Sequence, residues 1–299
     1  MWWGDPMISV PSGLVPDTPL LGCEGYDALA EINVASVRFY VPPYMGGAEG
    51  FEIMGRMPAL EVVQLPTAGF DHALNHLPEG VVMCNAGGVH DASTAELAVG
   101  LMIARLRRID DMARAMPRGQ WIADRYDALA DRRVVIVGAG GVGRAIAARL
   151  EPFEVEIALV ARTTRDGVHS LDELPRVLPE ADVVILAVPL DEMTQGMVDA
   201  EFLGRMRDGA LLVNVARGGV VRTDDLLVEV ASGRLQAALD VTDPEPLPTE
   251  HPLWTTPGVL ISPHVGGNTT AFAPRMRRLI TEQVARWRAG ESLHHVIRS

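Results

Sequence analysis

Residues 133–150 read RVVIVGAGGVGRAIAARL, and this stretch decides the fold. A β-branched run leads into a Gly-x-Gly-x-x-Gly motif, and an alanine-rich segment follows it. Gly138 allows a tight turn, Gly140 lets the backbone approach a pyrophosphate, and Gly143 lets a helix pack closely on the strand. The N-terminus of that helix offers free N–H groups to the anion. Because the motif stands between a strand and a helix, it predicts a dinucleotide site rather than a glycine-rich loop.

The rest of the chain alternates short β-branched runs with helical patterns, which is typical of βαβ units and a largely parallel sheet. Strands are expected in two series, before and after residue 130: 34–41, 61–65 and 81–84, then 134–137, 156–160, 183–188, 211–215, 236–240 and 259–261. The length of 299 residues favours two domains or one large one. The sequence therefore predicts an α/β protein.

The clearest helix is predicted from Ser93 to about Met116. Ser93 and Glu96 have the spacing of a capping box, and Pro117 with Gly119 ends the helical pattern. An apolar stripe repeats at helical spacing: Met102, Leu106, Ile109, Ala113 and Met116. Such a stripe usually packs in a core. A helix of this length also suits a connector between domains or a contact with a second subunit.

The amino-acid composition and the net charge disfavour several classes of binding partner. Hydrophobic residues make up 48% and charged residues 22%, as in a globular protein and not a disordered one. The formal net charge of −13 disfavours nucleic acid and anionic lipid as partners. No apolar run approaches the ~18 residues of a membrane span, and the first residues, MWWGDP, lack the basic segment of a secretory signal. We expect a cytoplasmic protein that binds neither nucleic acid nor membrane.

Cysteine and histidine give no clear metal site. The two cysteines, Cys23 and Cys84, are too few for a disulfide framework or a cysteine-rich metal site, so we expect reduced, mostly buried thiols. His72 and His76 have the i, i+4 spacing of a metal-binding pair, but no third ligand is clearly placed beside them. We expect surface or capping roles for both histidines and no bound metal.

The residues after the predicted strand 156–160 bear on which dinucleotide binds. NAD-selective sites usually place Asp or Glu about 20 residues past the motif, where the acid binds the ribose hydroxyls. Position 161, which is 161 − 143 = 18 residues past the last glycine, is alanine. Arg162, Thr163 and Arg165 follow, and their guanidinium and hydroxyl groups suit a 2′-phosphate. We expect NADP(H) to be preferred, with NAD(H) possible; the alternative is that the arginines are merely exposed loop residues.

Three polar segments each follow a predicted strand: NVARGG at 214–219, ALDVTDPEPLP at 238–248 and SPHVGG at 262–267. Open α/β sheets bind ligands outside the carboxyl ends of their strands. Arg217, Glu245 and His264 are therefore expected to converge although they lie far apart in the sequence.

Together these segments resemble the D-isomer-specific 2-hydroxyacid dehydrogenase family. The likeness begins near Glu61 and also takes in TAGFDH at 67–72, STAELA at 93–98 and VPL at 188–190, whereas the first 60 residues match poorly. RTTR at 162–165 is most similar to the NADP-preferring glyoxylate and hydroxypyruvate reductases of the family. Thr242 stands where many members carry Phe.

The resemblance implies two Rossmann-like parallel-sheet domains, with a dinucleotide-binding domain inserted into a flavodoxin-like substrate domain. We expect the substrate domain at 1–94 and 267–299, the dinucleotide-binding domain at 95–266, and the active site in the cleft between them. The family also implies a homodimer, with the 93–116 helix as its contact.

The implied reaction is hydride transfer between NADP(H) and a small 2-keto or D-2-hydroxy acid, with glyoxylate and hydroxypyruvate as first candidates. Reduction puts negative charge on the keto oxygen, which needs a proton donor and a fixed positive charge. His264 would supply the proton, and Glu245 would hold the tautomer of its ring. Arg217 would bind the keto oxygen and the carboxylate. By the same resemblance, Ala68 and Gly69 would offer backbone N–H groups to the carboxylate.

The cofactor contacts follow from the glycine motif and from the resemblance: Thr94, Gly138, Gly140, Gly141, Val142, Gly143, Arg162, Thr163, Arg165, Val188, Pro189, Ala216, Asp240 and Gly266. A function of another class stays open, because the related transcriptional corepressors, which are nucleotide-sensing binding proteins, keep a similar triad. Formate dehydrogenase chemistry is disfavoured, since the family's formate enzymes have a Gln–His pair where this chain has Glu245 and His264.

Overall fold

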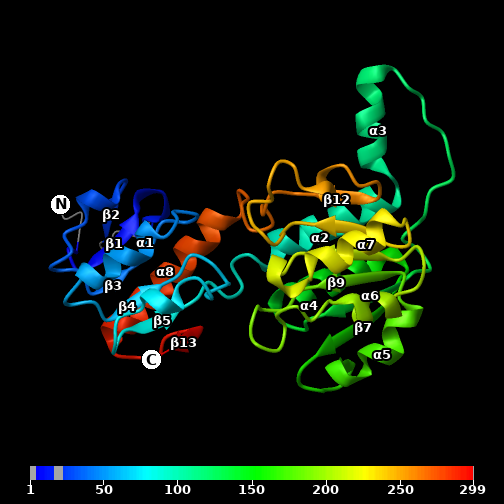
Figure 1. Ribbon diagram of the computed structural model, residues 1–299. Helices are drawn as coiled ribbons and strands as arrows, with labels where there is room; N and C mark the ends of the chain where they lie inside the picture. The colour runs from blue at the N-terminus through cyan, green and yellow to red at the C-terminus, as the bar shows by residue number, and fades with distance from the viewer. Residues whose placement is uncertain (1–4, 17–22, 299) are drawn as a thin grey trace. The chain divides into compact units, whose positions relative to one another are not determined.

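The computed structural model describes residues 5–16 and 23–298 and divides the chain into two compact units (Figure 1). Unit 1 comprises Met1–His90 with Thr269–Ser299, and unit 2 comprises Asp91–Asn268. The division therefore falls at 90/91 and 268/269, beside the boundaries expected at 94/95 and 266/267. The first boundary is earlier because the helix that opens unit 2 begins at Asp91, so that its whole first turn belongs to this unit.

Unit 2 contains a seven-stranded sheet in which every pairing is parallel, in the order β12-β11-β10-β9-β6-β7-β8. Its strands are β6 (Arg133–Val137), β7 (Glu156–Ala161), β8 (Val168–Ser170), β9 (Val183–Leu186), β10 (Leu211–Asn214), β11 (Gln236–Leu239) and β12 (Val259–Ile261). The six strands expected here are confirmed, and β8 was not foreseen. The strand order reverses between β6 and β9, which is where doubly wound sheets bind ligands.

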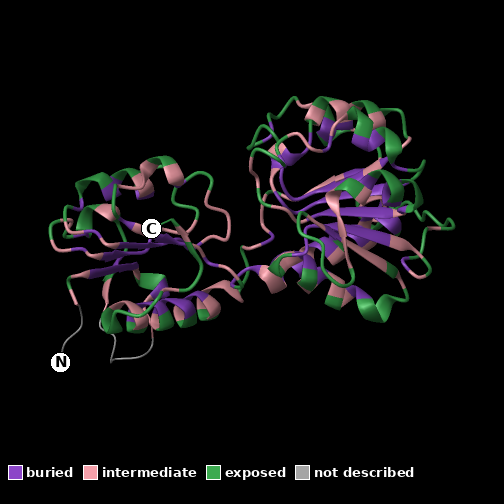
Figure 2. Cartoon of the chain, turned by 90° about the horizontal axis from the view of Figure 1, so that it is seen from below, coloured by how far each residue is buried: buried purple, intermediate pink, exposed green. Residues whose placement is uncertain are grey.

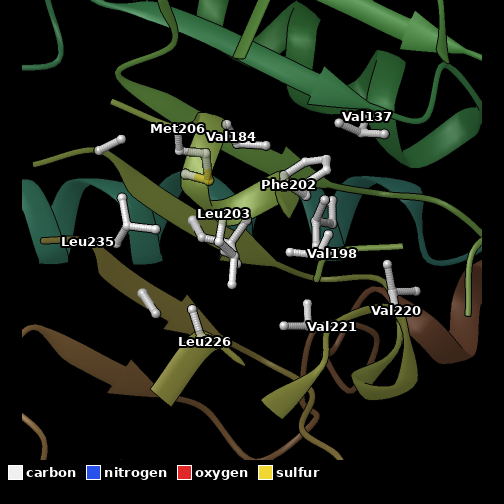
Figure 3. Close-up of a cluster of buried hydrophobic side chains, with 14 of the residues drawn as sticks. Val137, Val184, Val198, Phe202, Leu203, Met206, Val220, Val221, Leu226 and Leu235 are labelled. Carbon is white, nitrogen blue, oxygen red and sulfur yellow. The ribbon is translucent and has the colours of Figure 1, made fainter. Parts of the chain in front are cut away.

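Helices cover both faces of this sheet: α2 (Asp91–Leu106), α4 (Gly141–Leu150), α5 (Leu174–Val177), α6 (Ala200–Arg205) and α7 (Thr223–Ala231). Successive residues of β6 point to opposite faces, so Ile136 packs with α2 and α4 whereas Val137 packs with α5, α6 and α7. Figure 3 shows the cluster that contains Val137, in which Phe202 and Leu203 of α6 pack with Val184 of β9. The central strands β6, β9, β10 and β11 are almost entirely buried, whereas the outer strands are mostly half-buried and the outer faces of the helices are exposed (Figure 2).

The single helix expected from Ser93 to Met116 is wrong in two respects. It begins at Asp91, and Glu96 does not cap it but pairs with Arg149 of α4. It also ends at Leu106, after which Arg108 adopts a left-handed conformation with φ of 49°.

A separate helix α3 (Ile109–Ala115) follows, and Figure 1 shows it extending away from the sheet. The buried guanidinium of Arg105 pairs with Asp110 and Asp111, which fixes the turn between the two helices. The apolar stripe is therefore buried only as far as Leu106, while Met116 is 77% exposed.

Unit 1 contains a six-stranded sheet in the order β13-β5-β4-β3-β1-β2. Its strands are β1 (Ile8–Pro11), β2 (Glu24–Tyr26), β3 (Phe39–Tyr40), β4 (Val62–Gln64), β5 (Val82–Cys84) and β13 (Val296–Arg298). Only β13 runs antiparallel, against β5. Its α-helices are α1 (Glu49–Glu52) and α8 (Phe272–Ala289), and α8 packs Met276 and Ile280 against residues of β1, β3 and β4 in one of the two cores. The predicted α/β class with two parallel-sheet units is confirmed.

The strands expected at 34–41, 61–65 and 81–84 are β3, β4 and β5, although β3 is only two residues long. β1, β2 and β13 were not foreseen. Both cysteines are free thiols; Cys84 is buried and Cys23 half-buried. Burial raises the pKa of each thiol to about 11, so neither is a thiolate at neutral pH.

The core under α6 allows a direct test of the packing. Leu203 is fully buried in the cluster of Figure 3, so Leu203→Ala should lower the free energy of unfolding by about 2 to 5 kcal/mol. Val228 on α7 is 68% exposed, and Val228→Ala should change it by no more than about 0.5 kcal/mol. Urea unfolding followed by circular dichroism measures both; equal losses in the two variants would contradict the packing described.

Candidate active site

The glycine motif forms a turn that side chains would block. Gly138 has φ of +116°, and a Cβ atom added to it would lie 2.3 Å from the carbonyl oxygen of Ala187. A Cβ atom on Gly143 would lie 1.8 Å from the carbonyl oxygen of Gly138, so α4 packs directly on the end of β6. Gly140 differs, since no atom lies within 4 Å of an added Cβ. The open side of the turn is therefore at Gly140, beside the N-terminus of α4, where an anion would meet free N–H groups.

Asp91, an acidic residue that was not among the expected site residues, lies beside this turn. A Cβ atom on Gly141 would lie 2.0 Å from Oδ2 of Asp91, the first residue of α2. Gly141 is exposed and Val142 half-buried at the start of α4. The only local signal for Asp91 was its place just before the predicted helix start.

Two arginines lie at the carboxyl end of β7. Nη1 of Arg162 donates to Oδ2 of Asp191 over 2.8 Å, and Nη2 of Arg165 donates to the carbonyl oxygen of Ala139 over 2.9 Å. Arg165 thus bridges the end of β7 to the glycine turn, and Thr163 between them is exposed.

The end of β9 borders the same turn. The added Cβ atom on Gly138 would lie 3.1 Å from the backbone nitrogen of Val188, and Pro189 beyond it is exposed. The ends of β6, β7 and β9 therefore form one contiguous surface.

His264 and Glu245 form a close pair. Nδ1 of His264 lies 2.5 Å from Oε1 of Glu245, and the two side chains are 35% and 40% exposed. Nε2 of His264 has no hydrogen-bond partner among residues 5–16 and 23–298. An imidazole whose far nitrogen is held by a carboxylate keeps a fixed tautomer and orientation. The pair therefore leaves Nε2 open to a ligand; this atom accepts a proton when the ring is neutral and donates one when the ring is an imidazolium.

Asp240 fixes the loop that carries His264. It is 3% exposed, and its carboxylate accepts hydrogen bonds from Oγ of Ser262 over 2.6 Å and from the backbone nitrogens of Val265 and Gly266 over 2.9 Å each. His264 is held with φ of 51°, and its own N–H donates to the carbonyl oxygen of Asp240. Asp240 therefore acts first as a positioning residue for His264.

Thr94 lies against the same loop. A Cβ atom added to Gly266 would lie 3.4 Å from Cγ2 of Thr94 and 2.8 Å from Oδ2 of Asp240. The structure thus brings together three of the residues expected to contact the cofactor.

Arg217 lies in the next loop, after β10. A Cβ atom on Gly218 would lie 1.9 Å from the carbonyl oxygen of Thr242, so the loops that follow β10 and β11 touch through their backbones. Nη1 of Arg217 donates to the carbonyl oxygen of Ala216 over 2.8 Å, and the amide of Asn214 bonds both residues. Because β10, β11 and β12 are neighbours in the sheet, their carboxyl ends carry Arg217, Glu245 and His264 on one edge of unit 2.

The two residues expected to bind substrate lie in unit 1, after β4. The carbonyl oxygen of Ala68 accepts from Nδ2 of Asn85 over 2.6 Å, and that of Gly69 accepts from Oγ1 of Thr67 over 2.7 Å. Within the part of the chain that the structure describes, the N–H groups of Ala68 and Gly69 donate to no acceptor. Both donors are thus available to an anion.

The other expectations concerned metals and membranes. His72 and His76 lie 5.1 and 6.1 Å from the ring of Phe51, and the described residues contain no group of three metal-ligating side chains. In the same residues, no helix combines the length and hydrophobicity that crossing a membrane requires.

Comparison with known proteins identifies the family of the chain. The family model described as "D-isomer specific 2-hydroxyacid dehydrogenase, NAD binding domain" matches residues 99–266. The chain is 32% identical to human glyoxylate reductase/hydroxypyruvate reductase, over 78% of this chain and 76% of that protein. It is 33% identical to glyoxylate reductase of Thermofilum pendens, over 80% and 75%.

Solved structures give the same result. A D-isomer specific 2-hydroxyacid dehydrogenase from Xanthobacter autotrophicus, in complex with NADPH and MES, is 29% identical and superposes with a TM-score of 0.76 over 89% of this chain and 85% of that one. By its match to the family model and to these relatives, the chain belongs to the D-isomer specific 2-hydroxyacid dehydrogenase family and is an oxidoreductase.

Proposed function

We propose that this enzyme reduces a small 2-keto acid to the D-2-hydroxy acid and prefers NADP(H), with glyoxylate and hydroxypyruvate as first candidates. The observation that carries the proposal is the His264–Glu245 pair at 2.5 Å, on the same sheet edge as Arg217. The relatives named glyoxylate reductase or hydroxypyruvate reductase support this substrate class.

His264, Glu245 and Arg217 have different roles in the proposed reaction. The nicotinamide ring, when bound, supplies or accepts the hydride. Nε2 of His264 gives a proton to the keto oxygen as negative charge develops there, and Glu245 stabilises the imidazolium that precedes this transfer. Arg217 stays charged throughout and binds the substrate carboxylate and keto oxygen through its planar fork. In unit 1, the N–H groups of Ala68 and Gly69 are assigned, by the family resemblance, to the substrate carboxylate.

The cofactor has a matching set of groups in unit 2. The open turn at Gly140 and the N-terminus of α4 would hold the pyrophosphate, while Thr94, Ala216 and Gly266 border the nicotinamide end. At the adenosine end, Ala161 offers no acid to the ribose, and Arg162 with Arg165 offers two guanidiniums to a 2′-phosphate. We assign unit 2 to the dinucleotide and unit 1 to the substrate, which moves the expected boundaries of 94/95 and 266/267 to those of the two units.

A homodimer also fits the surface. Apolar side chains are exposed on α3 and just after it: Ile109 is 48% exposed, Met116 77%, Trp121 95% and Ile122 42%. Exposed apolar groups gathered on one projecting segment are typical of a protein interface. We propose that a second copy of the chain covers them.

The proton donor can be tested by substitution. His264→Ala should lower kcat for reduction of glyoxylate or hydroxypyruvate by about 10²- to 10⁴-fold, the usual contribution of a general acid. His169→Ala is the matched control, because His169 forms a similar pair with Glu173 at 3.1 Å on β8 and should leave kcat unchanged. The rate is read from the loss of NADPH absorbance. Near-normal turnover by His264→Ala would remove it from this role, and no turnover of any 2-keto acid by the unaltered enzyme would favour a binding protein.

Cofactor preference has its own test. We expect kcat/KM to be higher with NADPH than with NADH, because the arginines bind the 2′-phosphate. Arg165→Ala should lower kcat/KM for NADPH by about tenfold, as expected for one hydrogen bond between charged groups, and should change the value for NADH little. Equal efficiencies of the unaltered enzyme with both cofactors would refute the preference.

The dimer is tested by light scattering on the purified chain, with a predicted mass of twice 32.3 kDa. The double variant Met116→Ser, Trp121→Ser should shift the protein towards the monomer, since it removes the two most exposed apolar side chains of this segment. Val228→Ser, an exposed apolar change on α7, is the control. A dimer equally stable in all three proteins would place the contact elsewhere.

A further inference from the structure

The ion pair between Arg162 and Asp191 joins two loops that border the adenosine end of the cofactor site. Arg162 follows β7, and Asp191 lies in the loop after β9. Asp191 has no part in the proposed mechanism so far. Its position next to one of the two arginines that distinguish NADP(H) raises the question of what its carboxylate does to that arginine.

The carboxylate of Asp191 is fixed before any ligand binds. Its Oδ1 accepts from the backbone nitrogens of Met193 over 3.0 Å and Thr194 over 3.2 Å. The buried hydroxyl of Thr194 accepts from the backbone nitrogen of Asp191 over 2.8 Å and donates to the carbonyl oxygen of Pro189 over 2.6 Å. Partial desolvation acts to raise the pKa of Asp191, but these hydrogen bonds and the charge of Arg162 outweigh it, and its pKa lies below the ordinary value. Asp191 is therefore a rigid, ionised anchor.

Arg162 has hydrogen-bond donors that its pair with Asp191 does not use. The pair uses Nη1 of Arg162 and Oδ2 of Asp191, and within residues 5–16 and 23–298 neither Nε nor Nη2 of Arg162 forms a hydrogen bond. Nε and Nη2 form one edge of the planar guanidinium, which is the geometry that binds two oxygens of a phosphate. The side chain of Arg162 is 52% exposed, so without Asp191 it would sample many rotamers and would lose that freedom on binding.

We propose that Asp191 is a positioning residue for cofactor selection: it holds Arg162 by Nη1, so that the edge formed by Nε and Nη2 is ready for the 2′-phosphate of NADP(H). This inference rests on the proposed preference for NADP(H). The opposite effect, repulsion of the phosphate by the carboxylate, is offset because the positive charge of Arg162 lies between the two anions and attracts both, and water around the partly exposed pair weakens the repulsion further.

The test uses fragments of the cofactor and needs no turnover. Asp191→Asn keeps the shape and the oxygen that caps the loop but removes the charge that holds Arg162. Isothermal titration of the whole protein should show binding of 2′,5′-ADP weakened by about twofold to fivefold, the upper part of the range of an exposed ion pair, and binding of ADP unchanged. In the enzyme assay KM for NADPH should rise while kcat stays the same. Unchanged or tighter binding of 2′,5′-ADP to Asp191→Asn would overturn the inference.

Glu201→Gln is the matched control. It removes one carboxylate from a pair with Arg205 on α6, at 2.7 Å, and so makes the same change in net charge. We expect it to bind both fragments as the unaltered protein does. An equal loss of 2′,5′-ADP binding in Glu201→Gln would mean that net charge, and not positioning, is responsible.

Arg162→Ala separates this inference from the proposal beneath it. If the unaltered protein binds 2′,5′-ADP no better than ADP, or if Arg162→Ala leaves both affinities unchanged, the assignment of the 2′-phosphate to Arg162 fails and the role of Asp191 fails with it. If Arg162→Ala abolishes the preference, Asp191→Asn should have no further effect in that background. A full additional loss in the double variant would show that Asp191 acts independently of Arg162.

Discussion

Backbone contact at glycine positions holds the proposed active site together. The carbonyl oxygen of Gly138 lies where a side chain of residue 143 would be, and that of Thr242 lies where a side chain of residue 218 would be. Any Cβ atom at these points would force apart α4 and β6, or the loops after β10 and β11. The close approach places the anion-binding turn on the sheet, and it places Arg217 beside the segment that carries Glu245. Chemistry in this fold therefore depends on two residues that carry no functional group.

The second constraint is electrostatic: a buried carboxylate has to be paired with hydrogen-bond donors. Asp240 is almost fully buried, and three donors from residues 262–266 surround its carboxylate. A buried carboxylate needs such partners, since an unpaired one is costly. The same bonds hold His264 in its left-handed conformation. The hydrogen bonds to Asp240 therefore both stabilise the loop and orient the imidazole. These hydrogen bonds form without a bound ligand, which is the arrangement that the proposed proton donor needs.

Much of this was predictable because local signals agree with one another. The β-branched run, the three glycines and the helix that follows determine β6, the turn and α4 from a single stretch of sequence, and the alternation of strands and helices gives the parallel sheet. The placement of Arg217, Glu245 and His264 at one sheet edge was predictable because each follows a strand, and parallel strands end at the same edge. The α2–α3 break was missed, since the apolar stripe continues in sequence past the point where the sheet ends, and only the tertiary pairing of Arg105 marks the turn. β13 and Asp191 were missed for a related reason: strand pairing and ion pairs between distant segments leave no periodic trace.

The central claim is that Glu245 acts through His264 as one proton-delivering unit. Measuring kcat for reduction of a 2-keto acid with NADPH in the unaltered enzyme, Glu245→Gln, His264→Ala and the double variant tests it most directly. Residues that work as a unit give strongly non-additive losses, so the account predicts that Glu245→Gln lowers kcat in the unaltered background and has almost no effect once His264 is gone. Losses that multiply in the double variant would show two independent roles and would contradict the account.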